Sequence, residues 1–305
     1  MELALTVQCG QDDQLLLAQQ LGVETVFLET REWTPTALRR ARHWVTQTGL
    51  RLAGIENLPR SLYARAVVGL PGREAQIEQV CSAVRAAGEA GIPMVGYRWT
   101  PPGGQASERT AAGRGDALVR WRDTSAPDPA QVRFGPEHLW ATLEQFLGRV
   151  LPAAREAGLR LACHPDDPPV ACIGDAACIL ATLSSLQRLL ALSDSPCHGI
   201  DLCLGSLAGM VGADIQPALA SLPVDRVLAV HVRNARGRGP RLQDAFVDEG
   251  DLPLPQALAA LRRTGYRGLV RAAAPPGLVA DTAWGHKGRA YDLGYLKAVL
   301  QVLGA

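Results

Sequence analysis

The sequence lacks an excess of either sign of charge. Its 305 residues contain 31 lysines and arginines against 30 aspartates and glutamates, which leaves a formal net charge of +1 at pH 7. A chain without a strong net positive charge has no general electrostatic attraction to nucleic acid or to a membrane surface. We therefore expect no nucleic acid and no membrane among its partners.

Long apolar runs and a high cysteine content are also absent. No stretch of about 18 apolar residues occurs, which excludes a transmembrane helix. The amino terminus carries an acidic residue, Glu2, and no basic segment, so it does not resemble a signal peptide. Seven cysteines, an odd number in a chain of this length, indicate reduced thiols and a cytoplasmic protein.

Short apolar runs alternate with amphipathic segments along the chain. Eight runs of about six residues read as strands, and most follow a Gly or Pro turn. They span residues 3–8, 24–29, 50–55, 92–97, 159–164, 198–203, 226–231 and 268–273. Helical stretches lie between them, among them residues 34–48, 74–90, 136–157 and 253–263. Eight strand–helix repeats predict one α/β domain over residues 1–305, a single (β/α)8 TIM barrel.

One segment interrupts this alternation. Residues 99–135 are rich in proline, glycine and charge and show no sustained period. A loop of this length in a compact domain is typically functional or disordered. It follows the fourth predicted strand, at the face of the barrel where active sites lie. We expect a lid-like insertion over the site, with a merely mobile insertion as the alternative.

Three consecutive predicted strands end in metal-ligand side chains. These are His164, Cys203 and His231, and neighbouring strand ends of a barrel lie close enough to converge on one ion. Because side chains alternate along a strand, Cys163 must face the helices if His164 faces the barrel mouth. The pattern predicts a shared divalent metal at these three residues.

Several motifs resemble the mannonate dehydratase family. They are CHPDDPP (163–169), DLCLGS (201–206), HVRN (231–234), FVDEGD (246–251) and YDLGYLKAVLQ (291–301), with further matches upstream in the same order and at similar spacing. The resemblance implies a xylose isomerase-like TIM barrel that uses Mn²⁺ to dehydrate D-mannonate to 2-keto-3-deoxy-D-gluconate. It also implies that His164, Cys203 and His231 are metal ligands.

The last strand departs from the family pattern. An Arg-Pro-Asp-His stretch of the family corresponds here to residues 271–274, of which only Arg271 is retained. Ala273 stands at the position of a fourth metal ligand and Ala274 at that of a catalytic histidine. Alanine can neither coordinate a metal nor transfer a proton, so another group must supply the acid and base or the activity is lost.

Several side chains are candidates for the remaining roles. Tyr291 and His286 are the candidate catalytic acid and base, and one of the carboxylates at 248, 249 and 251 is a further candidate for the metal. Arg233 is the expected anchor of a substrate carboxylate, because a guanidinium binds carboxylate in a bidentate manner. The other predicted substrate-binding residues are Asn234, Asp166, Asp167, Glu56 and Arg271.

Three functions fit this sequence. The first is a hydro-lyase of the mannonate dehydratase type acting on a sugar acid. The second is a metal-dependent sugar isomerase or epimerase, and the third is a catalytically degenerate family member that binds a sugar acid or a metal. Mn²⁺ is the expected cofactor, although a His-Cys-His set also accepts Zn²⁺, Co²⁺ or Fe²⁺. A homo-oligomer is a further expectation.

Overall fold

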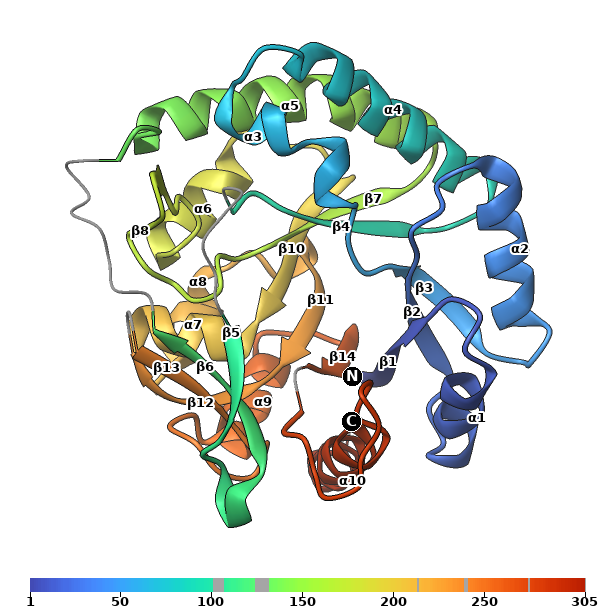
Figure 1. Cartoon of the computed structure of the whole chain (residues 1–305), viewed down its shortest axis with the longest axis vertical. Helices are drawn as coiled ribbons and strands as arrows, with labels where there is room; N and C mark the ends of the chain where they lie inside the picture. The colour runs from blue at the N-terminus through green and yellow to red at the C-terminus, as the bar shows by residue number, and fades with distance from the viewer. Residues whose placement is uncertain (101–106, 124–131, 213, 239–240, 274, 305) are drawn as a thin grey trace.

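The computed structural model forms a closed barrel of eight parallel strands surrounded by helices (Figure 1). It describes residues 1–305 except 101–106, 124–131, 213, 239–240, 274 and 305. The barrel strands are β1 (Glu2–Gln8), β2 (Thr25–Glu29), β3 (Arg51–Ile55), β4 (Met94–Arg98), β7 (Arg160–His164), β10 (His198–Cys203), β11 (Val227–Val232) and β14 (Leu269–Ala272). Each of the eight predicted strands is confirmed, and β1 closes the barrel by pairing with both β2 and β14.

Helices follow the strands around the outside of the barrel. The longer ones are α1 (Asp12–Gln20), α2 (Pro35–Thr46), α4 (Arg73–Glu89), α5 (Pro136–Glu156), α6 (Leu183–Ala191), α7 (Leu204–Val211), α9 (Leu254–Arg263) and α10 (His286–Val302). Within the described ranges, two shorter helices are α3 (Ala64–Val68) and α8 (Gln216–Ser221), and 3₁₀ turns cover Arg60–Leu62, Arg114–Asp116 and Val224–Arg226. Among the described residues, no helix combines the length and the hydrophobicity needed to span a bilayer.

Glycines end the helices as the sequence pattern indicated. Gly91 after α4 and Gly158 after α5 have φ values of +70° and +67°. This left-handed conformation is accessible to glycine without steric cost, and it turns the chain into the next strand. The backbone N–H groups of Ile92 and Leu159 then bond the carbonyls of Ala87 and Ala154 inside the preceding helices.

Side-chain alternation divides the strand residues between the barrel interior and the helix layer. Ala162 belongs to a small apolar cluster with Phe27 and Met94 inside the barrel, whereas Cys163 packs in the large cluster between strands and helices. His164 is therefore on the interior face, as predicted. β4 continues one residue beyond the predicted run, to Arg98.

The insertion after β4 contains ordered structure that the sequence pattern did not indicate. Within its described part, β5 (Ser107–Ala111) and β6 (Leu118–Asp123) form an antiparallel pair. β6 also pairs with β13 (Arg241–Ala245), which pairs with β12 (Asn234–Arg238) from the loop after β11. The insertion thus joins a four-stranded sheet beside the barrel (Figure 1). A two-stranded ribbon, β8 (Cys172–Ile173) and β9 (Ala176–Ala177), lies in the loop after β7.

Candidate active site

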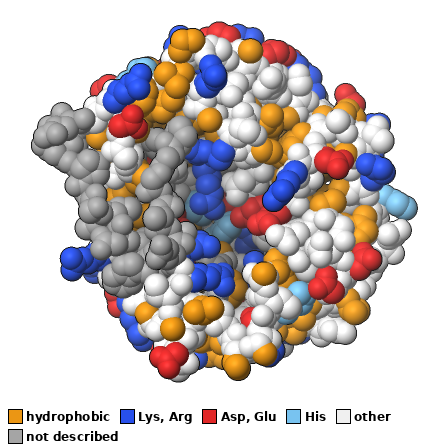
Figure 2. Space-filling model, viewed as in Figure 1, with side chains coloured by type: hydrophobic (Ala, Val, Ile, Leu, Met, Phe, Trp, Pro, Cys, Tyr) orange, Lys and Arg blue, Asp and Glu red, His pale blue; other side chains and the backbone are white. Residues whose placement is uncertain are grey.

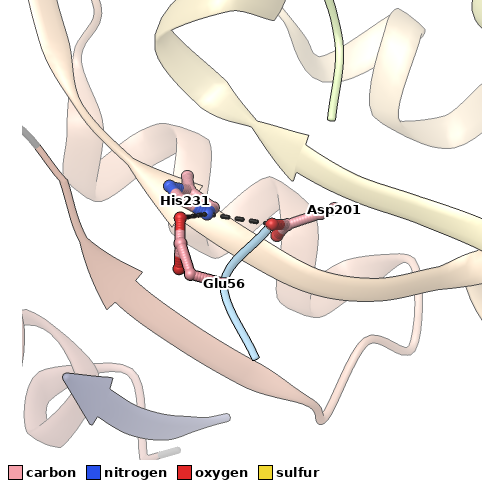
Figure 3. A group of neighbouring side chains, drawn as sticks. All are labelled: Glu56, Asp201 and His231. Carbon is pink, nitrogen blue, oxygen red and sulfur yellow. Dashed lines mark hydrogen bonds and ion pairs between the residues drawn. The ribbon is translucent and has the colours of Figure 1, made fainter. Parts of the chain in front are cut away.

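A buried cluster of charged side chains lies at the carboxyl ends of the barrel strands (Figure 3). Glu56 follows β3, Asp201 lies in β10 and His231 in β11, and each offers a ligand atom within 4.8 Å of the others. His231 Nε2 lies 2.9 Å from Asp201 Oδ2 and 3.3 Å from Glu56 Oε1. These three side chains form a group that could hold a metal ion.

Arg271 of β14 already provides a positive charge to these carboxylates. Its Nη1 lies 3.0 Å from Glu56 Oε2, and its Nη2 donates to Asp201. Its guanidinium carbon lies 3.7 Å from the centroid of the Phe27 ring, and only 1 % of the side chain is exposed. The hydroxyl of Thr6 donates to the same Glu56 oxygen at 3.0 Å.

Charge balance keeps both carboxylates ionised. Burial alone would raise the pKa of Glu56 and of Asp201, because desolvation disfavours the charged form. The positive charge of Arg271, together with the contact to His231, outweighs this effect, and the pKa of each carboxyl group is lowered. Two carboxylates against one guanidinium leave this cluster with a surplus negative charge that favours a further cation beside it.

His164 is held as a neutral imidazole with one nitrogen available. Its Nδ1 lies 2.6 Å from the carbonyl oxygen of Pro165, which places the proton on Nδ1 and leaves the Nε2 lone pair free. Burial, followed by the positive charge of Arg98 and the proximity of His231, lowers the pKa of His164 well below its usual value. A neutral imidazole oriented by a backbone carbonyl is the usual form of a histidine metal ligand.

Cys203 and His231 stand beside each other on neighbouring strands, as register partners. The Cys203 sulfur accepts the backbone N–H of Ser206 at 3.4 Å, in the first turn of α7. The imidazole ring of His164 packs edge-on against that of His231, with centroids 5.1 Å apart. The second ring nitrogen of His231 points away from Glu56 and Asp201 (Figure 3).

These donors border one cavity of about 230 Å³. Charged and histidine side chains gather at the centre of this face of the molecule (Figure 2). The cavity is lined by Thr6, Glu29, Glu56, Arg98, Arg109, Arg120, His164, Asp167, Cys203, His231, Arg233, Ala272, Ala273, Pro275 and Arg289. All three predicted metal ligands and Ala273 therefore line this cavity, whereas among the described residues only Glu56, Asp201 and His231 place ligand atoms within 4.8 Å of one another.

The predicted substrate-binding residues are engaged in contacts within the protein. Arg233 donates to Asp167 at 2.7 Å and to Asp244, so its two terminal nitrogens are shared by two carboxylates. Asp166 is buried and accepts from the hydroxyl of Thr100 and the backbone N–H of Leu180. Arg233 and Asp167 still reach the cavity wall, whereas Asp166 supports the loop behind it.

Asn234 stabilises the loop after β13. Its side-chain nitrogen donates to the carbonyls of Val247 and Leu252, and its oxygen accepts the N–H groups of Ala235 and Leu252. All of its contacts are therefore to the backbone.

The two candidate acid/base residues do not line the cavity. Tyr291 is partly exposed, packs edge-on against Phe246 and accepts from Arg114 at 3.3 Å. His286 lies 2.9 Å from an Asp13 carboxylate oxygen, next to α1.

The acidic loop after β13 also makes contacts away from the metal-ligand candidates. Asp248 and Glu249 pair with Arg114, and Asp251 accepts the N–H of Gly237. Residue 274, where the sequence has alanine in place of the family's histidine, lies outside the described residues.

Several residues of the site were missed by sequence reasoning. Asp201 precedes Cys203 by two positions on one strand, so alternation alone places both on the same face. Arg98 was missed because the predicted strand stopped at Tyr97, which instead packs in the core and contacts His198 Nε2 at 2.8 Å. Arg109 and Arg289 come from the insertion and from α10, where no local pattern indicates a direction.

The fold and the strand-end site define a TIM-barrel enzyme of the xylose isomerase-like type. A xylose isomerase domain protein from Planctomyces limnophilus has a TM-score of 0.67 at 14 % identity and covers 99 % of this chain and 97 % of its own. An L-ribulose 3-epimerase has a TM-score of 0.69 at 13 % identity, with coverage of 100 % and 96 %. These similarities concern the fold.

The chain belongs to the D-mannonate dehydratase (UxuA) family, whose model matches residues 131–305. Mannonate dehydratase 2 of Halalkalibacterium halodurans is 29 % identical over 289 residues, which cover 84 % of this chain and 81 % of that protein. The crystal structure of mannonate dehydratase from Streptococcus suis serotype 2 has a TM-score of 0.87 at 24 % identity and covers 99 % of this chain and 95 % of its own. These homologues indicate an enzyme of the hydro-lyase class.

Proposed function

We propose that this chain is a metal-dependent hydro-lyase that removes water from D-mannonate, or from a related sugar acid, to give 2-keto-3-deoxy-D-gluconate or its counterpart. One observation carries the proposal: His164, Cys203 and His231 line a single cavity together with arginines suited to an acidic substrate. Membership of the D-mannonate dehydratase family supports the reaction class.

The three donors fit a divalent cation, and we propose Mn²⁺, with Zn²⁺, Co²⁺ or Fe²⁺ as alternatives. Such a cation, when bound, supplies Lewis acidity that stabilises negative charge developing next to the substrate carboxylate. The protein would hold each donor in place: the Pro165 carbonyl orients His164, the backbone N–H of Ser206 donates to the Cys203 sulfur, and Asp201 orients His231.

Arg271 argues against a metal held by Glu56, Asp201 and His231. This group contains two carboxylates, an arrangement that would favour the alternative function of a sugar isomerase or epimerase. A guanidinium in contact with both carboxylates offsets one of their two negative charges and competes with any cation that would bind between them. The two carboxylates therefore serve to hold Arg271 and His231, and we retain the hydro-lyase as the main proposal.

Dehydration also requires a base for the proton α to the carboxylate and an acid for the leaving hydroxyl. Tyr291 and His286 remain proposed for these steps, although both would have to move to reach the cavity. Glu29 is a third candidate, because it lines the cavity and its contact is a side-chain hydrogen bond from Gln8 at 3.4 Å. The three candidates can be tested with the variants Tyr291→Phe, His286→Gln and Glu29→Gln. The variant that loses turnover but still binds metal identifies the residue that acts as acid or base.

The insertion is proposed as the cover of the site. Arg109 and Arg120, from β5 and β6, line the cavity, and Leu118 bridges to Gly277 after β14. A lid attached to both the insertion and the last loop would exclude water from the reaction. A cytoplasmic location, supported by seven free cysteines, and a homo-oligomer complete the proposal.

The direct test is turnover of D-mannonate by the purified protein with added Mn²⁺, with 2-keto-3-deoxygluconate as the measured product. We expect product, and we expect His231→Ala to abolish it and to release the metal, while the exposed His43→Ala control changes neither. Metal bound without product from any sugar acid would favour the degenerate binding protein. Isomerised sugar as product would favour the epimerase.

A further inference from the structure

Three arginines that line the cavity have no acidic partner among the residues that the structure describes. Arg98, Arg109 and Arg289 all border it, and within the described part of the chain none of them has a carboxylate oxygen within 4.0 Å. Arg289 donates through Nε to the carbonyl of Trp284 and packs over the Trp284 ring at 4.4 Å. This contrasts with Arg233 and Arg271, each of which contacts two carboxylates.

The three arginines come from three separate segments and leave two basic regions on the wall. Arg98 ends β4 and is the register partner of His164, beside the proposed metal ligands. Arg109 lies on β5 beside Gly277: a Cβ added to this glycine would lie 3.4 Å from Arg109 Nη1. Arg289 lies in the first turn of α10. One basic region therefore adjoins the metal end, and the other adjoins the insertion and the last loop.

Like charges that face one small cavity repel each other. The pKa of Arg289 is lowered by burial, and Arg109 adds to this effect while Glu29, Glu56 and Asp292 oppose it. An anionic ligand relieves such repulsion and gains charge-assisted hydrogen bonds from groups that are already in place. A single carboxylate can occupy one basic region, and the second then remains unpaired.

We propose that the substrate is a sugar acid with a second anionic group at the end opposite its reacting carboxylate. The first carboxylate would lie beside Arg98 and His164, and the second anion would bind Arg109 and Arg289. This inference rests on the proposed function for the sugar-acid class and goes beyond it in the charge of the substrate. The second anion is a carboxylate, as in a hexarate, or a phosphate, as in a 6-phosphohexonate.

The test compares equilibrium binding of D-mannonate, D-mannarate and D-mannonate 6-phosphate to the Mn²⁺-loaded protein by calorimetry. We expect at least one of the two compounds with a second anionic group to bind about 10- to 100-fold more tightly than D-mannonate, the gain typical of one or two charge-assisted bonds. Whichever of these two binds more tightly distinguishes a terminal carboxylate from a terminal phosphate. Turnover of the three compounds is measured separately.

Arg109→Gln and Arg289→Gln are expected to reduce this ratio of affinities to about threefold or less. Arg85→Gln removes the same charge from the surface of α4, where Arg85 pairs with Glu78, and should leave the ratio unchanged. Circular dichroism will show whether each variant is folded. Arg109 is exposed on β5, so its replacement should leave the fold intact.

The outcomes separate the two proposals. Turnover of D-mannonate with no tighter binding of D-mannarate or D-mannonate 6-phosphate overturns the inference and keeps the hydro-lyase. Tighter binding of either compound without turnover of any of the three supports the inference on substrate charge and contradicts the hydro-lyase. A ratio that persists in both arginine variants overturns the assignment of Arg109 and Arg289.

Discussion

Replacement of Arg271 by methionine tests the electrostatic core of the site. The change removes the guanidinium that contacts Glu56 and Asp201 and leaves a side chain of similar length in the barrel. Both carboxylates stay buried, with side-chain exposures of 10 % and 3 %. They would then face each other across His231 without their main counter-charge.

The expected loss of stability follows from this burial. Removal of one partner from a buried ion pair costs about 3–5 kcal/mol, because the remaining charge is desolvated and uncompensated. The lost contact of Arg271 with the Phe27 ring adds to this cost. Since a domain has a free energy of unfolding of about 5–15 kcal/mol, Arg271→Met should lose a large part of it. Adding Glu56→Gln removes one of the stranded charges and should recover at least about 1 kcal/mol.

Urea unfolding at pH 7, followed by the fluorescence of the six tryptophans, measures these differences. Arg267→Met is the matched control, because Arg267 is exposed and hydrogen-bonds only to backbone carbonyls of Arg262 and Tyr266 among the described residues; it should change stability by less than about 1 kcal/mol. The reasoning is refuted if Arg271→Met is as stable as this control, or if Glu56→Gln makes it less stable still.

Three further predictions concern the metal ligands and a buried acid. His164→Ala and His231→Ala should each lose bound metal, measured by plasma emission spectroscopy, while circular dichroism stays unchanged; unchanged metal content in both would show that the ligands lie elsewhere. Ala273→Asp places a carboxylate at the cavity wall and should tighten Mn²⁺ binding about tenfold or more in a titration, and an unaltered Kd would mean that another group already fills that corner. Burial raises the pKa of Asp292 to about 7; the charge of Arg289 opposes this effect, and Asp248 adds a smaller contribution to it. In the unfolded state the pKa of this carboxyl group is about 3.9, so between these two values the native state keeps a proton that the unfolded state has lost. Stability from this group is complete below about pH 4 and is lost as the pH rises to about 7, so the advantage of Asp292→Asn in urea midpoint should grow from pH 5.5 to pH 8, to a few kcal/mol; an advantage that shrinks over this interval contradicts the sign.

The barrel could be predicted from the sequence because its signals are local. Each strand is a short apolar run after a glycine or proline turn, and each helix has its own period, so eight repeats define the closed sheet. The side sheet could not be predicted in this way. Its central pairing joins Arg241 to Asp123 and Gln243 to Trp121, and contacts between segments so far apart in the chain leave no periodic pattern in either one.

The site was predictable where it depends on strand ends and not where it depends on loops. His164, Cys203 and His231 reach one cavity because parallel strands end at the same face. Tyr291 and His286 carry the right chemistry, but α10 directs them to Arg114 and Asp13. The direction of a side chain on the first turns of a helix depends on how that helix docks, and sequence motifs do not record this.

Residues 271 and 273, on β14 and on the segment that continues it, link the departure from the family motif to the substrate charge that we propose. Residues 271 and 273 point to the same side because they are two apart along the strand direction. The positive charge of Arg271 is paired with Glu56 and Asp201. Ala273 lines the cavity but lacks the negative charge that the aspartate of the family motif would place at this position. The wall is thus more positive by one unit, beside three arginines for which the described part of the chain offers no acidic partner. A ligand that brings a second negative charge restores the balance, so the loss of the acidic residue and the surplus of arginine have one common explanation.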